Sequence, residues 1–346
     1  MSSFPSSLPT PRVHPLRGGA VLRWGILAPG DIANDFVHAM HTHTDQRAVA
    51  VAGRSSERAA AFAGRHNIPR WHASHEALVG DPGVDIVYVA SPHSEHKRLA
   101  LLAIAAGKPV LVEKPVAMTA AEAREIRDAA AKAGVFAMEA MWTRYLPQTD
   151  VMLRLRDDGV LGDLRLAVAD FGTRGATDPA GRIYNPALGG GALLDLGIYP
   201  LWFAHLWLGK PSSITALGTL TATGVDEQTA IVLRYPSGAQ ALLSTNLMSF
   251  TPARASISGT EARIEVNPWF AVPAGFELVK PGKGDVRLHY VNATPLQFRD
   301  GLAWEAAAVA QHVHDGLLDS PLHPFAFAIE VMENMDEVRR QVGTLK

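Results

Sequence analysis

Apolar and polar residues alternate on two different length scales over the first 140 residues. Continuous apolar runs, rich in Val, Ile, Leu and Ala, lie at 22–28, 48–53, 84–90, 109–113 and 135–139. Stretches with helical spacing of apolar residues separate them, at 55–66, 93–106 and 119–133, and a further stretch reaches about His41. Thr119 and Glu122 form a capping-box pattern that opens the last of these helices. Continuous apolar strands that alternate with helices predict a doubly wound parallel sheet covered on both faces.

The pattern changes after about residue 143. Extended segments with few helical signals follow one another, at 162–171, 213–222, 229–235, 239–246 and 255–259, with two or three more up to Tyr290. Helical patterns lie before, among and after them, at 147–158, 192–208, 300–318 and 324–342. The Pro-Ser-Gly of 236–238 predicts a hairpin turn. This half is therefore expected to be α+β, built on an open, mostly antiparallel sheet.

The length of 346 residues corresponds to about two domains at ~150 residues each. The pattern places a flexible N-terminal arm at 1–20, an α/β domain at 21–143 and an α+β domain at 144–346. The fold class is thus α/β, with an N-terminal Rossmann-type sheet and a C-terminal α+β domain.

Charge and cysteine content exclude several classes of protein. Lys and Arg total 32 against 34 Asp and Glu, so the net charge of −2 argues against nucleic acid or an anionic membrane as a partner bound by bulk charge. The chain has no cysteine, which excludes disulfides, thiolate metal sites and a Cys nucleophile, and is compatible with a reducing, cytoplasmic setting. The N-terminus lacks the pattern of a secretory signal, and no uninterrupted apolar run approaches the ~18 residues of a membrane span.

The first strand-to-helix turn is a variant of the dinucleotide fingerprint Gly-x-Gly-x-x-Gly/Ala. Ala28 stands at the first glycine position, Gly30 at the second and Ala33 at the third. Gly30 lets the backbone approach a pyrophosphate, and Ala33 lets the helix pack closely on the strand. Ala28 does not readily adopt a positive φ, and Pro29 favours extended geometry there, so we expect an extended Ala28.

The end of the second strand favours NADP over NAD. An NAD site has Asp or Glu there to bind the ribose 2′-hydroxyl, whereas this chain has Gly53 followed by Arg54, Ser55 and then Arg58. A guanidinium can bind a 2′-phosphate. Ser55 is also expected to cap the following helix, and the two roles are compatible.

Two further motifs carry a family resemblance: Ser-Pro-His-Ser-Glu-His at 91–96, after the apolar run 84–90, and Glu-Lys-Pro at 113–115, at the end of the apolar run 109–113. With the Gly30 turn, they resemble the Gfo/Idh/MocA oxidoreductases, which include glucose-fructose oxidoreductase and inositol dehydrogenase. The segments 139–145 and 188–199, with the latter's Gly-Gly-Gly-Ala-Leu-Leu-Asp-Leu-Gly-Ile-Tyr, are most similar to the branch of dimeric dihydrodiol dehydrogenases and NADP-dependent aldose dehydrogenases. Tyr199 stands where the inositol dehydrogenases carry His.

The resemblance implies hydride transfer between NADP and a carbinol of an aldose or a trans-dihydrodiol. It implies a cis Lys114–Pro115 bond and a site in which Lys114, Asp195 and Tyr199 act on the substrate. A free Tyr has a pKa near ~10, and a nearby ammonium lowers it, so we expect Tyr199 to accept the proton and Lys114 to lower its pKa. If 195–199 is helical, Asp195 and Tyr199 share one face, and Asp195 then orients the substrate or Lys114.

Other residues are assigned to the cofactor and the substrate. The cofactor is expected to be held by residues of the strand ends and turns: Ala28, Gly30, Asp31, Ile32, Arg54, Ser55, Arg58, Ser91, His93, His96, Glu113, Lys114, Trp142 and Arg144. The expected substrate contacts are Trp142, Arg182 and Tyr184. For Trp269 and Phe270 core packing is the better expectation. No metal site is expected, because none of the histidine clusters has metal-ligand spacing.

Two alternatives remain at this point: an oxidoreductase that retains its cofactor and passes hydride between two sugars, and a non-catalytic NADP-binding sensor. A sensor has no need of a proton acceptor, which argues for the enzymes. The few helices available to cover the second sheet predict a homodimer or homotetramer formed through its face.

Overall fold

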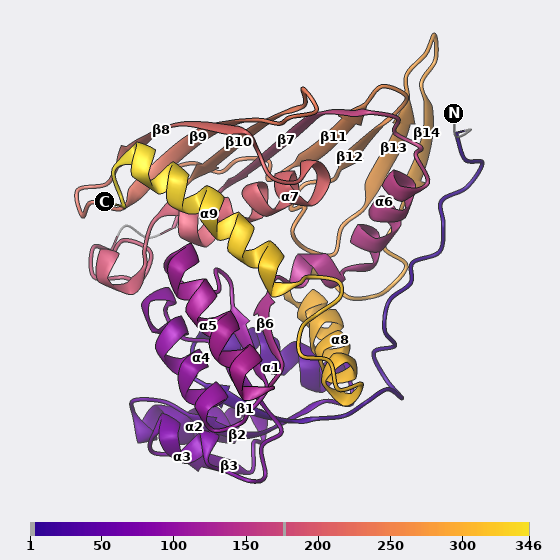
Figure 1. Ribbon diagram of the computed structural model, residues 1–346. Coiled ribbons are helices and arrows are strands. Elements are labelled where there is room, and N and C mark those ends of the chain that lie inside the picture. The colour runs from indigo at the N-terminus through magenta and orange to yellow at the C-terminus, as the bar shows by residue number, and fades with distance from the viewer. Residues whose placement is uncertain (1–3, 176–177, 346) are drawn as a thin grey trace. The chain divides into compact units, whose positions relative to one another are not determined.

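The computed structural model describes residues 4–175 and 178–345, so the first three residues of the expected arm and two residues of the long loop lie outside it. Two compact units share the chain. One comprises 13–145 and 296–329, and the other 4–12, 146–295 and 330–345 within the described residues. Each is described below by itself (Figure 1).

The unit built on 13–145 contains a six-stranded parallel sheet in the order β3-β2-β1-β4-β5-β6. Its strands are β1 (Arg23–Leu27), β2 (Arg47–Ala52), β3 (Arg70–His72), β4 (Ile86–Val89), β5 (Val110–Glu113) and β6 (Ala137–Ala140). Its helices are α1 (Asp31–His43), α2 (Ser56–His66), α3 (His75–Val79), η1 (His93–Glu95), α4 (His96–Ala105), α5 (Ala120–Ala133), η2 (Trp142–Tyr145), η5 (Phe298–Gly301) and α8 (Leu302–His314). Helix contacts form two groups, α1 with α2 and α8, and α4 with α3 and α5. The expected Rossmann-type sheet is confirmed.

Three neighbouring strands of the sheet are fully buried because most of their side chains are apolar on both faces. Strands β4, β5 and β6 are buried at every position. Trp24 on β1 packs edge-on against Phe36 of α1, and Phe36 stacks on Tyr88 of β4 at 4.0 Å. This is the expected consequence of continuous apolar strands between helices.

The other unit contains an eight-stranded sheet in the order β14-β13-β12-β11-β7-β10-β9-β8. Its strands are β7 (Leu164–Gly172), β8 (Ser213–Leu220), β9 (Asp226–Arg234), β10 (Gln240–Asn246), β11 (Ala255–Gly259), β12 (Arg263–Val266), β13 (Phe276–Lys280) and β14 (Val286–Tyr290). All adjacent pairs are antiparallel except β7 and β10. Its helices are α6 (Pro147–Asp157), η3 (Pro186–Leu188), the π-helical η4 (Leu193–Gly197), α7 (Ile198–Leu208) and α9 (Phe325–Val342), which enters from the other unit. The mostly antiparallel sheet and the hairpin turn at 236–238 are confirmed.

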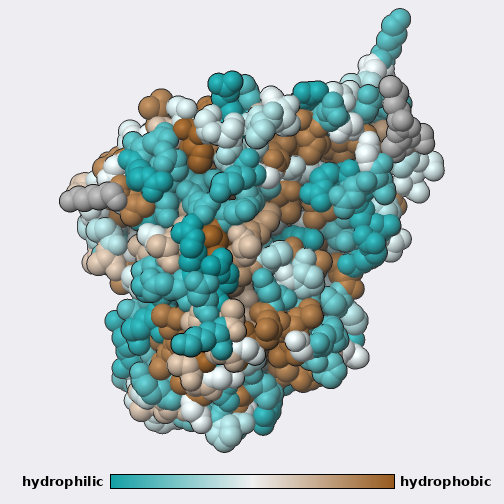
Figure 2. All heavy atoms as spheres, in the orientation of Figure 1, coloured by the Kyte–Doolittle hydropathy of each residue, from teal (hydrophilic) through white to brown (hydrophobic). Residues whose placement is uncertain are grey.

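Helix α7 is the core helix of this unit, and it packs on β7, β10 and β11. The stretch Pro186–Leu208 has the length and mean hydropathy, 1.3, of a membrane-crossing helix, and 78% of its most apolar window is buried within the fold. Its apolarity is explained by this burial. Figure 2 shows hydrophobic residues in small groups among hydrophilic ones on the face that it draws.

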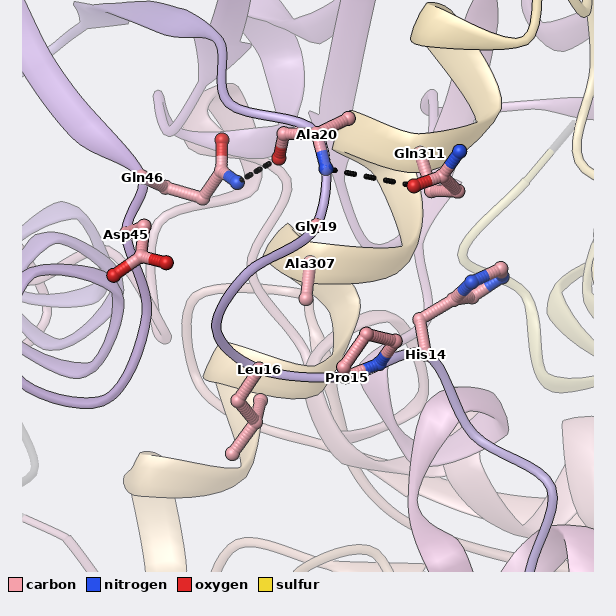
Figure 3. A pocket seen from close by; sticks show the side chains of 9 residues that line it. All are labelled: His14, Pro15, Leu16, Gly19, Ala20, Asp45, Gln46, Ala307 and Gln311. Carbon is pink, nitrogen blue, oxygen red and sulfur yellow. Dashed lines mark hydrogen bonds between the residues drawn. The ribbon is translucent and has the colours of Figure 1, made fainter.

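The described part of the expected N-terminal arm contacts folded structure. The Arg12 N–H donates to Asp150 at 2.8 Å within one unit. Within the other unit, 14–20 lie beside α8, where the Ala20 carbonyl accepts from Gln46 at 2.6 Å and the Ala20 N–H donates to Gln311 at 3.5 Å (Figure 3). This segment therefore has specific partners on both units.

Candidate functional site

The turn between β1 and α1 exposes the start of the helix. Gly30 is the N-cap of α1 and has no side chain with which to cap it, and a Cβ placed at Gly30 would meet no heavy atom within 4 Å. Asp31 and Ile32 follow as the first helical residues. Backbone amides at an open helix start suit an anion such as a pyrophosphate, so the turn fits the nucleotide that the fingerprint implies.

Ala28 corrects one expectation. Its φ is +68°, in the left-handed region, and not extended. The Ala28 N–H donates to the Ala52 carbonyl at 2.9 Å, and the Gly30 N–H donates to the Ala28 carbonyl at 2.9 Å. These bonds close the turn tightly and override the local preference of a residue before proline.

The end of β2 lies against the same turn. A Cβ at Gly53 would come within 2.8 Å of the Pro29 ring. Arg54 is exposed next to this contact, and the Arg58 guanidinium reaches the Pro29 carbonyl at 3.5 Å. Ser55 caps α2 by accepting the Arg58 N–H at 3.2 Å, which confirms its expected capping role. Two guanidinium groups thus stand near the open helix start.

The segment after β4 combines a buried hydroxyl with two buried histidines. Among the described residues the Ser91 hydroxyl is buried without a hydrogen-bond partner, a feature that fits a bound polar ligand. The His96 ring lies between the carbonyl oxygens of Pro115 and Ser91, 2.7 and 2.9 Å from its nitrogens. His93 packs edge-on against His96 at 5.5 Å. His96 therefore links the β4 loop to the Glu-Lys-Pro loop.

Lys114 follows β5, and the Lys114–Pro115 bond is cis, as the resemblance implied. Two buried carboxylates accept backbone amides on either side of this bond. Glu113 accepts the Lys114 N–H at 3.1 Å and also the Tyr88 hydroxyl. Glu139 accepts the Val116 N–H at 2.9 Å. The backbone that carries Lys114 is thereby fixed on both sides.

Further buried ionisable side chains lie near this loop. Glu139 pairs with His323 at 2.9 Å, and both side chains are 1% exposed. Glu305 of α8 is fully buried, and among the described residues neither of its oxygens has a hydrogen-bond partner. Burial, reinforced by the charges of Glu113 and Glu139, raises the pKa of Glu305 well above its ordinary value. Burial also raises the pKa of Glu113, while the Lys114 ammonium opposes that shift. Burial thus favours the protonated form of Glu305.

Trp142 and Arg144 of η2 are held by groups from the 296–329 segment. Trp142 is 3% exposed, and the Arg299 guanidinium lies 5.5 Å from the centre of its ring. Arg144 donates to the Leu322 carbonyl at 2.8 Å. Their expected cofactor and substrate contacts remain predictions.

In the other unit, Asp195 and Tyr199 lie on one continuous helical segment. Asp195 is in the π turn η4 and Tyr199 in the first turn of α7. Asp195 pairs with Arg182 at 3.1 Å, with side chains 15% and 41% exposed. Tyr199 is 4% exposed and stacks on Phe171 at 5.3 Å. The structure thus brings Arg182 to Asp195, and the expected substrate contact of Arg182 stays a prediction.

Aromatic side chains pack around Phe171, which stacks on Tyr199. Phe171, at the end of β7, contacts Trp269 at 5.7 Å and Phe270 at 6.0 Å, both edge-on. Phe270 is core, as expected, whereas Trp269 is 40% exposed with φ +62°, so core packing was the wrong expectation for it. Tyr184 is 6% exposed, with its hydroxyl 4.0 Å from the Met248 sulfur. Sequence patterns did not point to Phe171, since it is one apolar residue in an apolar strand.

Residues 4–175 and 178–345 contain no group of three or more His, Asp or Glu side chains arranged to hold a metal ion. Near Lys114, Glu113 and Glu139 instead bind backbone amides, and Glu139 also pairs with His323.

The chain matches two family models. Residues 22–141 match the oxidoreductase family with an NAD-binding Rossmann fold, and residues 151–265 match the GFO/IDH/MocA C-terminal domain. A trans-1,2-dihydrobenzene-1,2-diol dehydrogenase of Xenopus laevis is 38% identical over 330 residues, covering 93% of this chain and 98% of the relative. The mouse enzyme of the same name is 38% identical over 328 residues, covering 93% and 97%.

Two solved structures resemble the chain over nearly its whole length. KijD10, a 3-ketoreductase of Actinomadura kijaniata in complex with NADP and TDP-benzene, has a TM-score of 0.80 at 25% identity, covering 93% of this chain and 98% of that one. The aldose-aldose oxidoreductase of Caulobacter crescentus also has a TM-score of 0.80 at 25% identity, covering 93% and 97%.

Proposed function

The chain belongs to the GFO/IDH/MocA oxidoreductase family, and we propose that it is an NADP-dependent dehydrogenase acting on a carbinol of an aldose or a trans-dihydrodiol. The observation that carries the proposal is the pair Asp195 and Tyr199 on one helical segment, with the Tyr199 ring buried on Phe171. Relatives at 38% identity that are trans-dihydrodiol dehydrogenases support the substrate class.

Each unit supplies one part of the chemistry. NADP+, when bound, would supply the acceptor for the hydride of the carbinol carbon. The open start of α1 at Gly30 would hold the pyrophosphate, and the buried Ser91 hydroxyl offers a polar contact to the same ligand. Tyr199 takes the hydroxyl proton as the carbonyl forms. Lys114 holds the reacting oxygen, and Asp195 orients the substrate.

The test of this assignment is Tyr199→Phe, which keeps the ring and its packing and deletes the acid/base group. General acid/base catalysis contributes ~10²–10⁴-fold, so kcat is expected to fall by that order while NADP binding changes little. The pH dependence of the oxidation rate that reports this proton transfer should disappear in the variant. A variant that keeps most of kcat and the same pH dependence would show that another group accepts the proton.

The preference for NADP over NAD follows from the groups at the end of β2. Arg54 and Arg58 are exposed there, and no carboxylate stands at 53–56 to bind a ribose 2′-hydroxyl. Arg54→Ala is expected to raise KM for NADP roughly tenfold or more, because a hydrogen bond to a charged group contributes about 1.5–3 kcal/mol. KM for NAD should change little. Equal use of both cofactors by the unmutated protein would refute the preference.

The substrate is expected to present apolar faces as well as hydroxyls. Phe171 stacks on Tyr199, and Trp269 contacts Phe171 edge-on. Aromatic rings suit sugar C–H surfaces or a dihydrodiol ring. NADP+ reduction measured with a panel of aldoses, polyols and trans-dihydrodiols tests this class. If the protein oxidises none of these compounds and oxidises only an alcohol of another class, this substrate class is excluded.

A second candidate is a cofactor-retaining enzyme that passes hydride between two sugars. It is favoured by the likeness to the aldose-aldose oxidoreductase. Nicotinamide absorbance that survives purification, with turnover only when two sugars are present, would select this alternative over a dehydrogenase that exchanges its cofactor.

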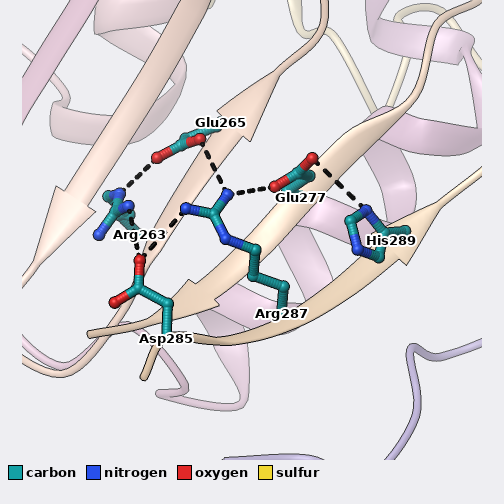
Figure 4. Close-up of polar contacts among 6 residues, drawn as sticks. All are labelled: Arg263, Glu265, Glu277, Asp285, Arg287 and His289. Atoms are coloured by element: carbon teal, nitrogen blue, oxygen red, sulfur yellow. Dashed lines mark hydrogen bonds and ion pairs between the residues drawn. The ribbon is translucent and has the colours of Figure 1, made fainter. Parts of the chain in front are cut away.

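We further propose a cytoplasmic homodimer or homotetramer assembled through the eight-stranded sheet. Val168, Leu242 and Val232 are direct cross-strand neighbours on one face and are 38–43% exposed. Beyond them, β12 to β14 carry a network in which Arg287 pairs with Glu277, Glu265 and Asp285 (Figure 4). An apolar patch beside paired charges is typical of an interface. A light-scattering mass near 37.1 kDa at micromolar concentration would refute the assembly.

A further inference from the structure

Asp226, the first residue of β9, lies buried under the start of the helical segment that carries Asp195 and Tyr199. It is 3% exposed, and its Oδ2 accepts the backbone N–H of Leu193 at 2.6 Å. Leu193 opens the π turn that contains Asp195. A carboxylate that accepts a backbone amide at a helix start makes a charge-assisted bond and is aligned favourably with the helix dipole.

The backbone before Leu193 is shaped to admit this carboxylate. Gly191 has φ +115°, and a Cβ there would lie 2.2 Å from the Asp226 Oδ1, so only glycine leaves room. The Gly191 N–H donates to the Ile183 carbonyl at 2.8 Å, and the Thr245 hydroxyl donates to the Ala192 carbonyl at 3.2 Å. Three consecutive residues are thus held by three different strands or loops of one unit.

We propose that Asp226 is a positioning residue that fixes the turn at 191–193 and, through it, the orientation of Asp195 and Tyr199. The inference rests on the proposed function, because it concerns the residues assigned to proton transfer there. The helical segment runs without interruption from Leu193 to Leu208, so a shift of its first turn moves both side chains.

The charge state of Asp226 gives this role a chemical signature. Burial raises the pKa of Asp226 to about 6, although the Leu193 amide and Arg339 oppose the shift. Arg339 lies on α9 and pairs with Asp336 at 3.7 Å. Two other charged residues lie close in sequence to the bonded pair: Asp195, two residues after Leu193, and Glu227, next to Asp226 on β9. Asp226 is therefore ionised at neutral pH and takes up a proton near pH 6, which converts one acceptor oxygen into a donor.

The first experiment measures amide hydrogen exchange of residues 190–200 in the ligand-free protein at pH 7. Asp226→Asn keeps one acceptor oxygen and loses the charge, whereas Asp226→Ala keeps neither. Exchange is expected to be faster in Asp226→Asn than in the unmutated protein, and fastest in Asp226→Ala. This measurement needs no substrate, so it tests the cap, the hydrogen bond from the Leu193 N–H to Asp226, separately from the proposed function.

A matched control is available at Asp319. Both of its oxygens lie within 3.0 Å of the Phe325 N–H at the start of α9, a helix to which no catalytic group is assigned. Asp319→Asn and Asp319→Ala thus remove a similar cap elsewhere. They should speed exchange at the start of α9 and leave kcat, per folded molecule, unchanged.

The second experiment measures kinetics per folded molecule. Misplacement of a reacting group by about 1 Å can cost ~10²-fold, so kcat of the Asp226 variants is expected to fall roughly tenfold to a hundredfold, with KM for NADP nearly unchanged. The decline of kcat below about pH 6 should be absent in Asp226→Asn. Unchanged exchange at 190–200 in Asp226→Ala, or a loss of kcat no larger than in the Asp319 variants, overturns the proposal. Failure of the unmutated protein on every substrate would overturn the proposed function, and the exchange result would still decide the cap.

Discussion

Lys114 and Tyr199 are held in place by different physical means in their respective units. Around Lys114 the backbone amides are bound by the buried carboxylates Glu113 and Glu139. Tyr199 stacks on Phe171, and Asp195, four residues before it, pairs with Arg182, whose side chain is 41% exposed.

The difference has an energetic consequence. Buried carboxylates are costly to desolvate, and breaking one buried pair leaves an uncompensated charge. Aromatic packing costs no charge desolvation and tolerates small adjustments. Lys114 is therefore expected to sit in the more rigid and more damage-sensitive environment, and Tyr199 in the more adaptable one.

The largest expected effect is on kcat, and it concerns Lys114, whose backbone loop is bound by the buried carboxylates. Lys114→Ala removes the ammonium group that we propose holds the reacting oxygen, so kcat should fall at least ~10²–10⁴-fold. Lys114→Arg keeps the positive charge and serves as the matched variant, and the pH dependence assigned to Tyr199 should persist in it. Steady-state kinetics across pH measure both. Retention of most of kcat in Lys114→Ala would remove Lys114 from the mechanism.

The next prediction compares how much two His–Glu pairs, with equal N···O distances, contribute to stability. The His323–Glu139 pair spans 2.9 Å with both ends 1% exposed, and the His205–Glu330 pair also spans 2.9 Å, but its carboxylate is 45% exposed. His323→Leu should lower the free energy of unfolding by about 3–5 kcal/mol, because Glu139 loses its partner while buried. His205→Leu should cost clearly less, since water can solvate Glu330. Urea unfolding of both variants measures the difference, and equal losses would contradict the comparison.

Much of this arrangement could be predicted from the sequence. The parts that could not be predicted have one cause in common. The apolar runs predicted five of the six parallel strands, but β3 and α3 are short and expose much of their surface, so they lack a clear hydrophobic period. Glu113, Lys114, Asp195 and Tyr199 lie in local motifs. Their partners do not, because contacts that span long sequence separations leave no local pattern: His323 meets Glu139 across 184 residues.

Local preferences also failed where tertiary hydrogen bonds overrode them. Ala28 was expected to be extended before Pro29, and it is left-handed because its N–H and carbonyl close a tight turn with Ala52 and Gly30. The segment 192–208 was expected to be one helix, and its first turn is π-helical, beside the Asp226 carboxylate and Gly191. In both places a backbone conformation depends on residues distant in sequence.

A smaller effect concerns the buried Glu305 of α8. The pKa of Glu305 is raised by burial, so the folded state binds its proton more tightly than the unfolded state does. Its contribution to stability is complete below the ordinary pKa of a glutamate and decreases as the pH rises toward the raised value, with a slope of at most about 1.4 kcal/mol per pH unit. Glu305→Gln should therefore gain stability relative to the unmutated protein as the pH rises from 4.5 to 7. Unfolding free energies at several pH values measure the gain, and a constant difference would mean that Glu305 does not titrate as inferred.

The smallest effect on stability is expected at the ion pair of the other unit. Arg182→Ala removes the partner of Asp195, but the guanidinium is 41% exposed, and such pairs contribute about 0–1 kcal/mol. Lys210, which pairs with Glu333 at 2.8 Å and is 61% exposed, provides a control pair in the same unit. Arg182→Ala and Lys210→Ala should therefore have nearly equal unfolding free energies. Their kinetics should differ, because only Arg182 contacts a residue assigned to the substrate. KM for the substrate should rise in Arg182→Ala and stay constant in Lys210→Ala. If Arg182→Ala instead cost as much stability as His323→Leu, the environment of Asp195 would be as rigid as that of Lys114, and the contrast between the two units would not hold.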